Sequence, residues 1–455
     1  MMTGTRPDMP DIKGKLEKIK PMLTSNHIKF LNQSEIKQIS ELIENMIQNY
    51  NLMELELIID ELLKKIPVND VFSIKIMYYK VKKEILCRNL IEANKFINLG
   101  LNKIRNIHIN DSDIDRINKL FMIEKYKREY LSGVYKQSLE YYSAFESNIN
   151  LDSIIRIEVS LNIGSIYLLT GDIQSCINIY NECFNIVKGM EKTFLQVKIT
   201  HLLGEYYSKL GDFDYSKNFY KLSLEYSEDQ KNLYYIGKNL VKLFIMDYYQ
   251  NSNKLDDFFL LKLKNYQKQT LKSDFFSKII SIFLIIELRE KISRLKVLIK
   301  DFNDQIAEPE ILIVIIESLI EFQIKHLKVE YAENKVNDLL LSIIALENTS
   351  KKYNMTFYYF KSLLLKSKIS VLKQNFSENI QILQDAIVSA ENLKLTAYAK
   401  FIHLEIEKIS LLIPLHQPSK NNHLVAEMLQ NQQIFQLIDL FHNLTYRLSI
   451  IKQNL

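Results

Sequence analysis

The chain has 455 residues, of which 47% are hydrophobic and 25% charged, so it can bury a large core and is not a disordered protein. The formal charge is only +5, which gives no electrostatic reason to expect nucleic acid. The start, MMTGTRPDMPDIKGK, lacks an apolar signal segment, and no later run reaches the roughly 20 apolar residues of a membrane span. Because Cys87, Cys176 and Cys183 also lack disulfide spacing, we expect a soluble cytoplasmic protein without a membrane partner.

The N-terminal part is expected to hold a helical block over residues 11–66, after a disordered tail over residues 1–10. In SEIKQISELIENMIQNY the apolar residues form one stripe of an amphipathic helix, with Asn32 or Ser34 as its cap and Glu35 in its first turn. The exposed faces of the block are acidic, and no basic recognition helix follows a short turn, which argues against DNA contact. We interpret the block as an effector module that contacts protein.

The segment from Thr200 to Tyr220 repeats the pattern of Ser160 to Tyr180, forty residues earlier. Shared between the two are a glycine and tyrosine, a Gly-Asp turn and a final tyrosine: Gly164/Gly204, Tyr167/Tyr207, Gly171-Asp172/Gly211-Asp212 and Tyr180/Tyr220. Each unit predicts a helical hairpin, in which the glycine ends the first helix and the aspartate caps the second. Small residues recur where the two helices approach closely, so Cys176 and Cys183 are expected to be buried packing residues.

The same spacing of small residues recurs elsewhere, at Ala93 and Gly100 and again at Asn379 and Ala386. With weaker matches between them, about eight helical hairpins account for residues 67–413. This predicts an all-α solenoid, because hairpins too thin to be stable alone share a continuous core when they stack. Residues 414–455 then form a helix or hairpin with an apolar face, which either caps the last unit or pairs with a second chain to give a homodimer.

The two clearest units resemble the tetratricopeptide repeat family. Its Leu-Gly-x-x-Tyr, Ala and Ala signature is matched by Ile163-Gly164-Ser165-Ile166-Tyr167, Cys176 and Cys183. The family's tryptophan is replaced by Ser160 and Thr200, and its closing proline is missing. A unit of about forty residues is more similar to the divergent repeats of Gram-positive intracellular peptide-pheromone receptors, the group that contains the Rap phosphatases, NprR, PlcR and the AimR regulators.

This resemblance implies a right-handed superhelix, a role in quorum sensing and an output module at the N-terminus. The glutamine that Rap phosphatases use for catalysis has no matching motif around Gln33, Gln38 or Gln48, so phosphatase activity is not carried over. Phosphate loops, nucleophile elbows and zinc motifs are absent from the sequence. DSDIDRINKLFM begins like a calcium loop, but Arg116 and Met122 replace its required glycine and glutamate. We therefore expect no enzyme, catalytic residue, cofactor or metal.

A solenoid of hairpins leaves a concave groove lined by the first helix of each unit. In the geometry that the resemblance implies, the second, fifth, sixth and ninth residues of a unit face this groove. An asparagine can bind a peptide backbone and lysines can bind carboxylates, as in the carboxylate clamp of chaperone-binding tetratricopeptide domains. The expected ligand-binding residues are Glu158, Asn162, Ser165, Lys198, His201, Glu205, Lys238 and Lys242; the alternative is that these are ordinary solvated helix faces.

These observations favour a cytoplasmic regulatory receptor that binds a short peptide or an extended protein tail in the groove and changes its contacts with a target protein. Two alternatives stay open. The chain could be a constitutive interaction scaffold, or, ranked lower because of the acidic N-terminal block, a peptide-controlled DNA-binding transcription regulator.

Overall fold

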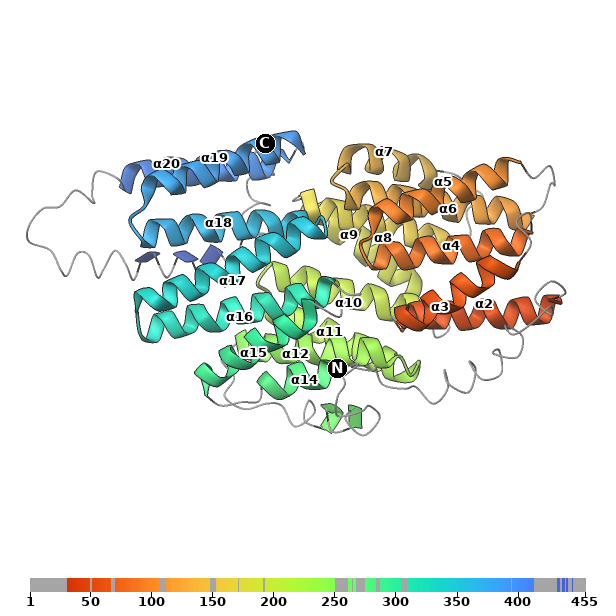
Figure 1. Cartoon of the computed structure of the whole chain (residues 1–455), viewed down its shortest axis with the longest axis horizontal. Coiled ribbons are helices and arrows are strands. Elements are labelled where there is room, and N and C mark those ends of the chain that lie inside the picture. Colours follow the sequence, from red (N-terminus) through yellow and green to blue (C-terminus); the bar gives the residue numbers. More distant parts are fainter. Residues whose placement is uncertain are drawn as a thin grey trace, which may run out of the picture.

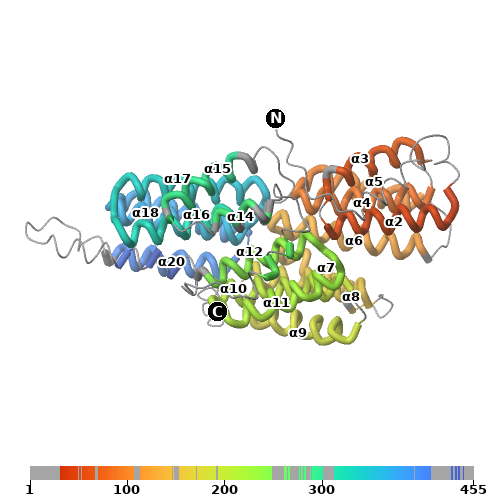
Figure 2. The backbone as a smooth tube through the Cα atoms, turned by 90° about the horizontal axis from the view of Figure 1, so that it is seen from below, coloured from red at the N-terminus to blue at the C-terminus, as the bar shows by residue number. Residues whose placement is uncertain are grey.

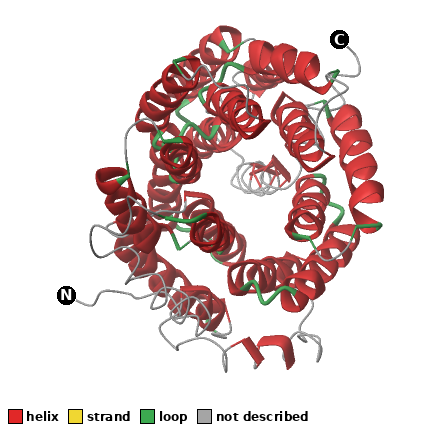
Figure 3. Cartoon of the chain, turned by 90° about the vertical axis from the view of Figure 1, so that its right-hand side faces the viewer, coloured by secondary structure: helices red, strands yellow, loops and turns green. Residues whose placement is uncertain are grey.

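The computed structural model describes residues 31–49, 51–66, 70–106, 112–147, 153–170, 172–190, 193–249, 261–263, 265–266, 275–283, 287–303, 309–393, 395–412 and seven residues between 432 and 444. Every regular element in these ranges is an α-helix, as the sequence predicts. Seen along the long axis, the helices wind into a ring (Figure 3). The tail over residues 1–10, the calcium-like Asp111 and the turn residue Gly171 lie outside the described residues.

Successive helices pack against each other as hairpins, and helices two apart also touch, for example α4 with α6 and α10 with α12. The even-numbered helices therefore form one row and the odd-numbered helices another. In chain order the helices are α2 (Gln33–Gln48), α3 (Leu52–Lys65), α4 (Val71–Leu86), α5 (Leu90–Arg105), α6 (Ser112–Leu131), α7 (Tyr135–Glu146), α8 (Ser153–Thr170), α9 (Ile173–Lys188), α10 (Phe194–Lys209), α11 (Phe213–Asp229), α12 (Leu233–Tyr249), α14 (Phe275–Phe283), α15 (Leu288–Asn303), α16 (Pro309–Val329), α17 (Glu333–Lys352), α18 (Thr356–Leu372), α19 (Phe376–Asn392) and α20 (Thr396–Leu412).

The predicted forty-residue step is visible in where the helices begin. The first helices of five consecutive units, α4, α6, α8, α10 and α12, start at residues 71, 112, 153, 194 and 233. Later units are less regular, because α14, α16 and α18 start at residues 275, 309 and 356. The solenoid of about eight hairpins is thus confirmed, with its most even spacing in the first five units.

A glycine and a tyrosine set how closely the helices of each clear repeat pack. A Cβ atom added to Gly164 would lie 2.5 Å from the ring of Tyr180, and one added to Gly204 would lie 2.7 Å from the ring of Tyr220. Both tyrosines are fully buried. Because only a glycine leaves room for the ring, the repeated residues preserve one close-packed contact in each unit. Cys176 and Cys183 are buried on the same helix as Tyr180, as predicted, and neither forms a disulfide among the described residues.

The turn inside each repeat also follows the predicted chemistry. Gly211 adopts a φ of 78°, the left-handed conformation that commonly ends a helix. The carboxylate of Asp212 accepts a hydrogen bond from the backbone N–H of Tyr215 at 3.3 Å, and Asp172 accepts one from Ser175 at 3.2 Å. Each aspartate therefore satisfies one of the amides left free at the start of the second helix.

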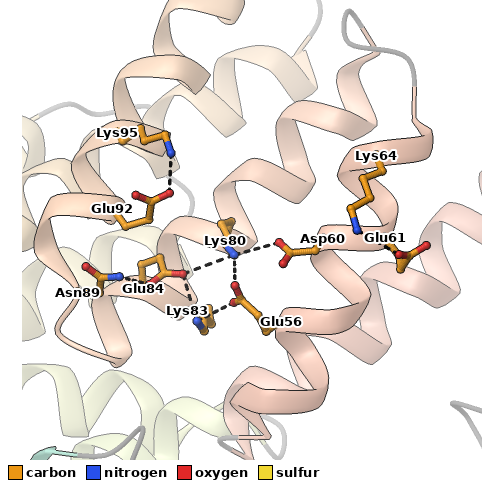
Figure 4. A network of polar contacts seen from close by, with 10 residues as sticks. All are labelled: Glu56, Asp60, Glu61, Lys64, Lys80, Lys83, Glu84, Asn89, Glu92 and Lys95. Atoms are coloured by element: carbon orange, nitrogen blue, oxygen red, sulfur yellow. Dashed lines mark hydrogen bonds and ion pairs between the residues drawn. The ribbon is translucent and has the colours of Figure 1, made fainter.

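The N-terminal helices α2 and α3 are joined to the first repeat by a shared core and by ion pairs. Asn32 caps α2 as predicted, in a capping box with Glu35. The core is continuous from Ile39 on α2 to Tyr79 on α4. Ion pairs link α3 to α4: Glu56 and Asp60 on α3 pair with Lys80 and Lys83 on α4. Figure 4 shows these four side chains with their neighbours. The role of residues 11–66 as an effector module stays a prediction.

The array curls far enough for two distant parts to touch. Tyr135, at the start of α7, donates a buried hydrogen bond to the hydroxyl of Thr356, at the start of α18. Nearby, a Cβ atom added to Gly133 would lie 2.8 Å from the side chain of Leu393. Figures 1 and 2 show the N-terminal helices and the C-terminal helices as two arms, with α10 and α12 between them. The superhelix therefore closes around its own interior.

The described residues of the C-terminal segment lie against α18. Leu437, Leu440 and Leu444 are buried in the same core as α18, and their spacing places them on one face of a helix. Lys368 on α18 donates a hydrogen bond to the Gln436 side chain at 3.4 Å. In Figure 1 these residues are the short blue pieces next to α18. Because residues 360–365 of α18 are all buried, every face of that helix is covered at this point.

One helix in the described part of the chain, α8, is long and apolar enough to cross a membrane by length and composition alone. Half of it is buried inside the structure. Its buried residues include Ile163 and Ile166, which belong to the protein core, and α8 packs against both α7 and α9. Its length and apolar composition therefore fit its place as a core helix of the array.

Candidate functional site

A cavity of about 270 Å³ lies where the inner helices α8, α10 and α12 face the turn between α17 and α18. One wall carries polar and charged side chains from the inner helices. The opposite wall is formed by residues 354–358, with Tyr135 hydrogen-bonded to Thr356, whereas Phe276 packs against α12. The closure of the two arms therefore turns the open groove of the repeats into a partly enclosed site.

Six of the eight residues expected to bind a ligand line this cavity: Ser165, Lys198, His201, Glu205, Lys238 and Lys242. The forty-residue step brings them together, because equivalent positions of α10 and α12 lie next to each other. Leu202 and Val241 from the same groove positions also line the cavity. The six predicted residues, Leu202 and Val241 therefore line the same cavity.

Glu158 and Asn162 do not line the cavity. Residues 159–164 of α8 are all buried, so every face of the helix is covered at this point, and only 7% of Asn162 is exposed. Burial raises the pKa of the Glu158 carboxyl, but the nearby charges of Lys82, Lys198 and Lys127 outweigh it and hold this pKa below its usual value. Glu158 therefore acts as a neighbouring counter-charge to the wall.

His201 is a neutral, buried imidazole at the centre of a polar network. Its Nδ1 lies 2.8 Å from the Asn239 Oδ1, and the Asn239 amide donates to Ser223 Oγ at 2.9 Å. Burial lowers the pKa of His201 to about 4, with the charge of Lys238 acting in the same direction. Because the Asn239 oxygen faces it, Nδ1 carries the proton and Nε2 is left as an acceptor.

Glu205 is the carboxylate of the cavity wall. Its Oε1 lies 3.3 Å from Lys242 Nζ and 3.5 Å from His201 Nε2. Burial raises the pKa of this carboxyl, but Lys242 and the neighbouring His201 more than compensate and hold it well below its usual value. Glu205 is thus ionised at neutral pH and already paired with one lysine.

Lys198 and Lys209 lack such a partner. In the part of the chain that the structure describes, no carboxylate lies within ion-pair distance of either ammonium group. Burial lowers the pKa of Lys198 to about 8 and also lowers that of Lys209. The Lys209 Nζ lies 5.1 Å from the centre of the Phe357 ring and 5.8 Å from that of Tyr358, both on the opposite wall. These aromatic faces offset only part of the cost of burying the charge.

Several residues of the site were missed by the sequence analysis, among them Lys209, Phe357 and Tyr358. Lys209 lies one helical turn beyond Glu205 and on the same face of α10, so continuing the groove pattern by four residues would have found it. Phe357 and Tyr358 had no such signal, because they reach the cavity only through the curl of the whole array.

The arrangement suits binding of a small polar ligand with apolar parts. Ammonium groups lie opposite aromatic rings in a partly enclosed cavity, where electrostatic interactions are stronger than in bulk water. Among the described side chains, no group of three or more His, Cys, Asp or Glu residues is placed to hold a metal ion.

The tetratricopeptide repeat family model matches residues 157–186 and 197–230, which cover α8–α9 and α10–α11. No curated protein matches the chain. Among solved structures, the chain is similar to a Rap protein complexed with Competence and Sporulation Factor, with 11% identity, a TM-score of 0.43 and coverage of 76% of this chain and 100% of that one. It is also similar to the apo form of RapI, with 12% identity, a TM-score of 0.39 and coverage of 84% and 99%. The chain therefore contains tetratricopeptide repeats, a helical module of protein interaction, within an all-α solenoid.

Proposed function

We propose that the protein is a cytoplasmic regulatory receptor that binds a short peptide, or an extended protein segment, in the concave site formed by α8, α10 and α12. Ligand binding changes the pitch of the array and thereby its contacts with a target protein. This is a shift between two arrangements of the repeats, which requires that the ligand bind one of them better than the other.

The observation that carries this proposal is the partly enclosed cavity on the concave side, with charged and polar side chains from neighbouring repeats on its wall. Its residues come from both arms of the superhelix, since Tyr135 lies at the start of α7 and Thr356 at the start of α18, and also from α10 and α12 between the arms. A ligand that contacts both walls therefore acts on the distance between the arms. The N-terminal block, which packs on α4, moves with one of these arms.

A three-residue variant tests where the ligand binds. Replacing Lys198, Lys238 and Lys242 together should abolish binding of peptides from the low-molecular-weight fraction of the host's culture, measured by native mass spectrometry; Asn162 is left unchanged because it is buried outside the cavity. Far-ultraviolet circular dichroism should show the same helicity as the original protein. If the variant retains the affinity, the ligand binds to another surface.

Solution scattering tests the change of pitch. A bound peptide should change the radius of gyration of the protein, whereas identical scattering profiles with and without a bound peptide would contradict switching. A partner protein that co-purifies with equal yield in both states would favour a constitutive scaffold instead.

A further inference from the structure

The cavity carries more positive than negative charge. Among the described residues that line it, Glu205 is the one carboxylate. Five lining side chains are cationic: Arg88, Lys198, Lys209, Lys238 and Lys242. Glu205 already lies 3.3 Å from Lys242. The wall therefore retains an excess of positive charge after its own ion pair is formed.

This excess is least compensated at two lysines, because their nearest described carboxylates, Glu158 for Lys198 and Glu205 for Lys209, lie beyond ion-pair distance. Lys198 lies in the second turn of α10 and Lys209 at its end, about 16 Å further along the helix. Holding an ammonium group away from water without a counter-charge costs free energy. An anion bound at either group would offset this cost, so this wall favours a negatively charged ligand.

A second, independent group points to a donor in the same ligand. His201 is only 2% exposed, and its Nε2 forms no hydrogen bond. The nearest partner, the Glu205 carboxylate at 3.5 Å, is itself an acceptor and cannot satisfy it while the imidazole is neutral. Because His201 lines the cavity, an N–H group of a ligand could donate to Nε2.

The size of the cavity limits how much of the ligand it holds. A volume of about 270 Å³ corresponds to roughly nine water molecules, which is enough for a short stretch of peptide but not for a long one. Tyr235, Phe276 and Phe357 supply apolar surface next to the charged groups. A ligand that fits both is a small amide-containing segment with one acidic group.

We propose that the site recognises an acidic stretch of peptide, whose carboxylate pairs with Lys198 or with Lys209 on the wall formed by α10, while a backbone N–H donates to His201 Nε2. This inference rests on the proposed function and names the ligand class of the same site. The carboxylate can come from an aspartate or glutamate side chain or from the C-terminus of a peptide, and the experiment separates these two sources.

The test uses four hexapeptide pools with the same apolar positions. In three pools both ends are blocked, and the two central residues are Asp, Asn or Lys. The fourth pool has Asn at the centre and a free C-terminus. Native mass spectrometry of the full-length protein with each pool should show binding of the Asp pool at least about tenfold tighter than of the blocked Asn and Lys pools. Preferred binding of the fourth pool over the blocked Asn pool would support the inference with a terminal carboxylate.

Variants of the two lysines complete the test. The double variant Lys198→Met and Lys209→Met should lose the preference for the acidic pool, whereas Lys209→Arg keeps the charge and should retain it. Lys136→Met is the matched control, because that side chain is 75% exposed on α7. If the double variant does not fold, the comparison among pools with the original protein and Lys209→Arg still decides the matter.

The outcomes separate this inference from the proposed function. Equal binding of all four pools, or stronger binding of the Lys pool, would overturn the acidic ligand while leaving peptide binding intact. Retention of the acidic preference in the folded double variant would overturn the role of the two lysines. Binding of no pool at all would contradict the proposed function and, with it, this inference.

Discussion

Two clusters of lysines and carboxylates in this protein differ in whether the lysines have carboxylate partners within ion-pair distance. Between α3 and α4, Lys80 and Lys83 meet three carboxylates: Lys80 pairs with Glu56 and, at 3.0 Å, with Asp60, and Lys83 pairs with Glu56 at 2.6 Å and with Glu84 at 3.1 Å. In the cavity, Lys198 and Lys209 meet none within ion-pair distance among the described residues. The first cluster is complete within the chain, and the second is not.

The pKa shifts follow this difference. Burial lowers the pKa of Lys83, but its hydrogen bond to Glu56 and the nearby negative charges outweigh burial and raise this pKa to about 12. For Lys198, burial is not outweighed, and its pKa falls to about 8. Carboxylate partners therefore keep Lys83 charged, whereas Lys198 has no such partner to offset burial, as a lysine that waits for an anionic ligand would under the proposed function.

Breaking the paired cluster should have the largest effect on stability. Lys80→Met leaves Glu56, Asp60 and the buried Glu84 short of one counter-charge. Breaking a buried ion pair destabilises a protein by about 3–5 kcal/mol. We expect a loss at the lower end, about 3 kcal/mol in the free energy of unfolding, because solvent screens the partly exposed Glu56 and Asp60. Urea denaturation measures this loss. The exposed Lys64→Met, which breaks only a surface pair with Glu61, should change the value by less than about 0.5 kcal/mol.

The buried imidazole predicts acid sensitivity at the cavity. The pKa of His201 is about 4 in the folded protein, below the 6.5 expected when it is unfolded, so the unfolded chain binds more protons between these values. Lys238, Glu205 and Asn239 are the polar groups that face this imidazole. Its contribution to stability is therefore complete above pH 6.5 and is lost as the pH falls toward 4, by about 2–3 kcal/mol.

The measurement is a pair of stability profiles. Unfolding free energies of the original protein and of His201→Gln are compared from pH 7 to pH 4. The original protein should lose more stability than the variant over this range. Parallel curves would show that His201 is not held neutral by the fold.

The contact that closes the ring should have a moderate effect. Tyr135→Phe removes the hydroxyl that donates to Thr356 and leaves that buried partner without it. We expect a loss of about 1 kcal/mol, and a double-mutant cycle with Thr356→Val should give a coupling energy of similar size. Coupling near zero would mean that the two arms do not form this bond in solution.

The smallest effect on stability is expected at the unpaired lysine. Lys209→Met removes a buried charge that has no counter-ion and keeps a flexible apolar side chain against Phe357 and Tyr358. The free energy of unfolding should stay the same or rise by up to about 1 kcal/mol. A loss similar to that of Lys80→Met would remove the distinction between the two clusters.

The sequence was sufficient for features that depend on neighbouring residues or on one repeat step. The Gly-Asp turns, the contact of Gly164 with Tyr180 and the shared position of Lys198 and Lys238 all follow from a pattern that recurs every forty residues. These features are local, so the residues that create them lie close together in the chain.

Other features of the site depend on how small rotations add up along the whole array. Tyr135 and Thr356 are 221 residues apart in the chain, and the spacing between units is irregular after α12. No single repeat indicates how far the superhelix will turn, so the second wall of the cavity could not be predicted. For Asn162, the information missing from the sequence is the rotation of α8 about its own axis, which decides whether this residue faces the cavity or the core.

The most direct test of the central claim is lysine labelling, read by mass spectrometry, with and without the acidic hexapeptide pool. In the free protein, a reagent that attacks neutral amines should modify Lys198, whose lowered pKa keeps a larger fraction uncharged than at Lys80, whose pKa is raised. We predict that the peptide protects Lys198 and Lys209 and leaves the labelling of Lys136 unchanged. Equal modification of Lys198 and Lys209 in the presence and absence of bound peptide would contradict a ligand site on the concave wall.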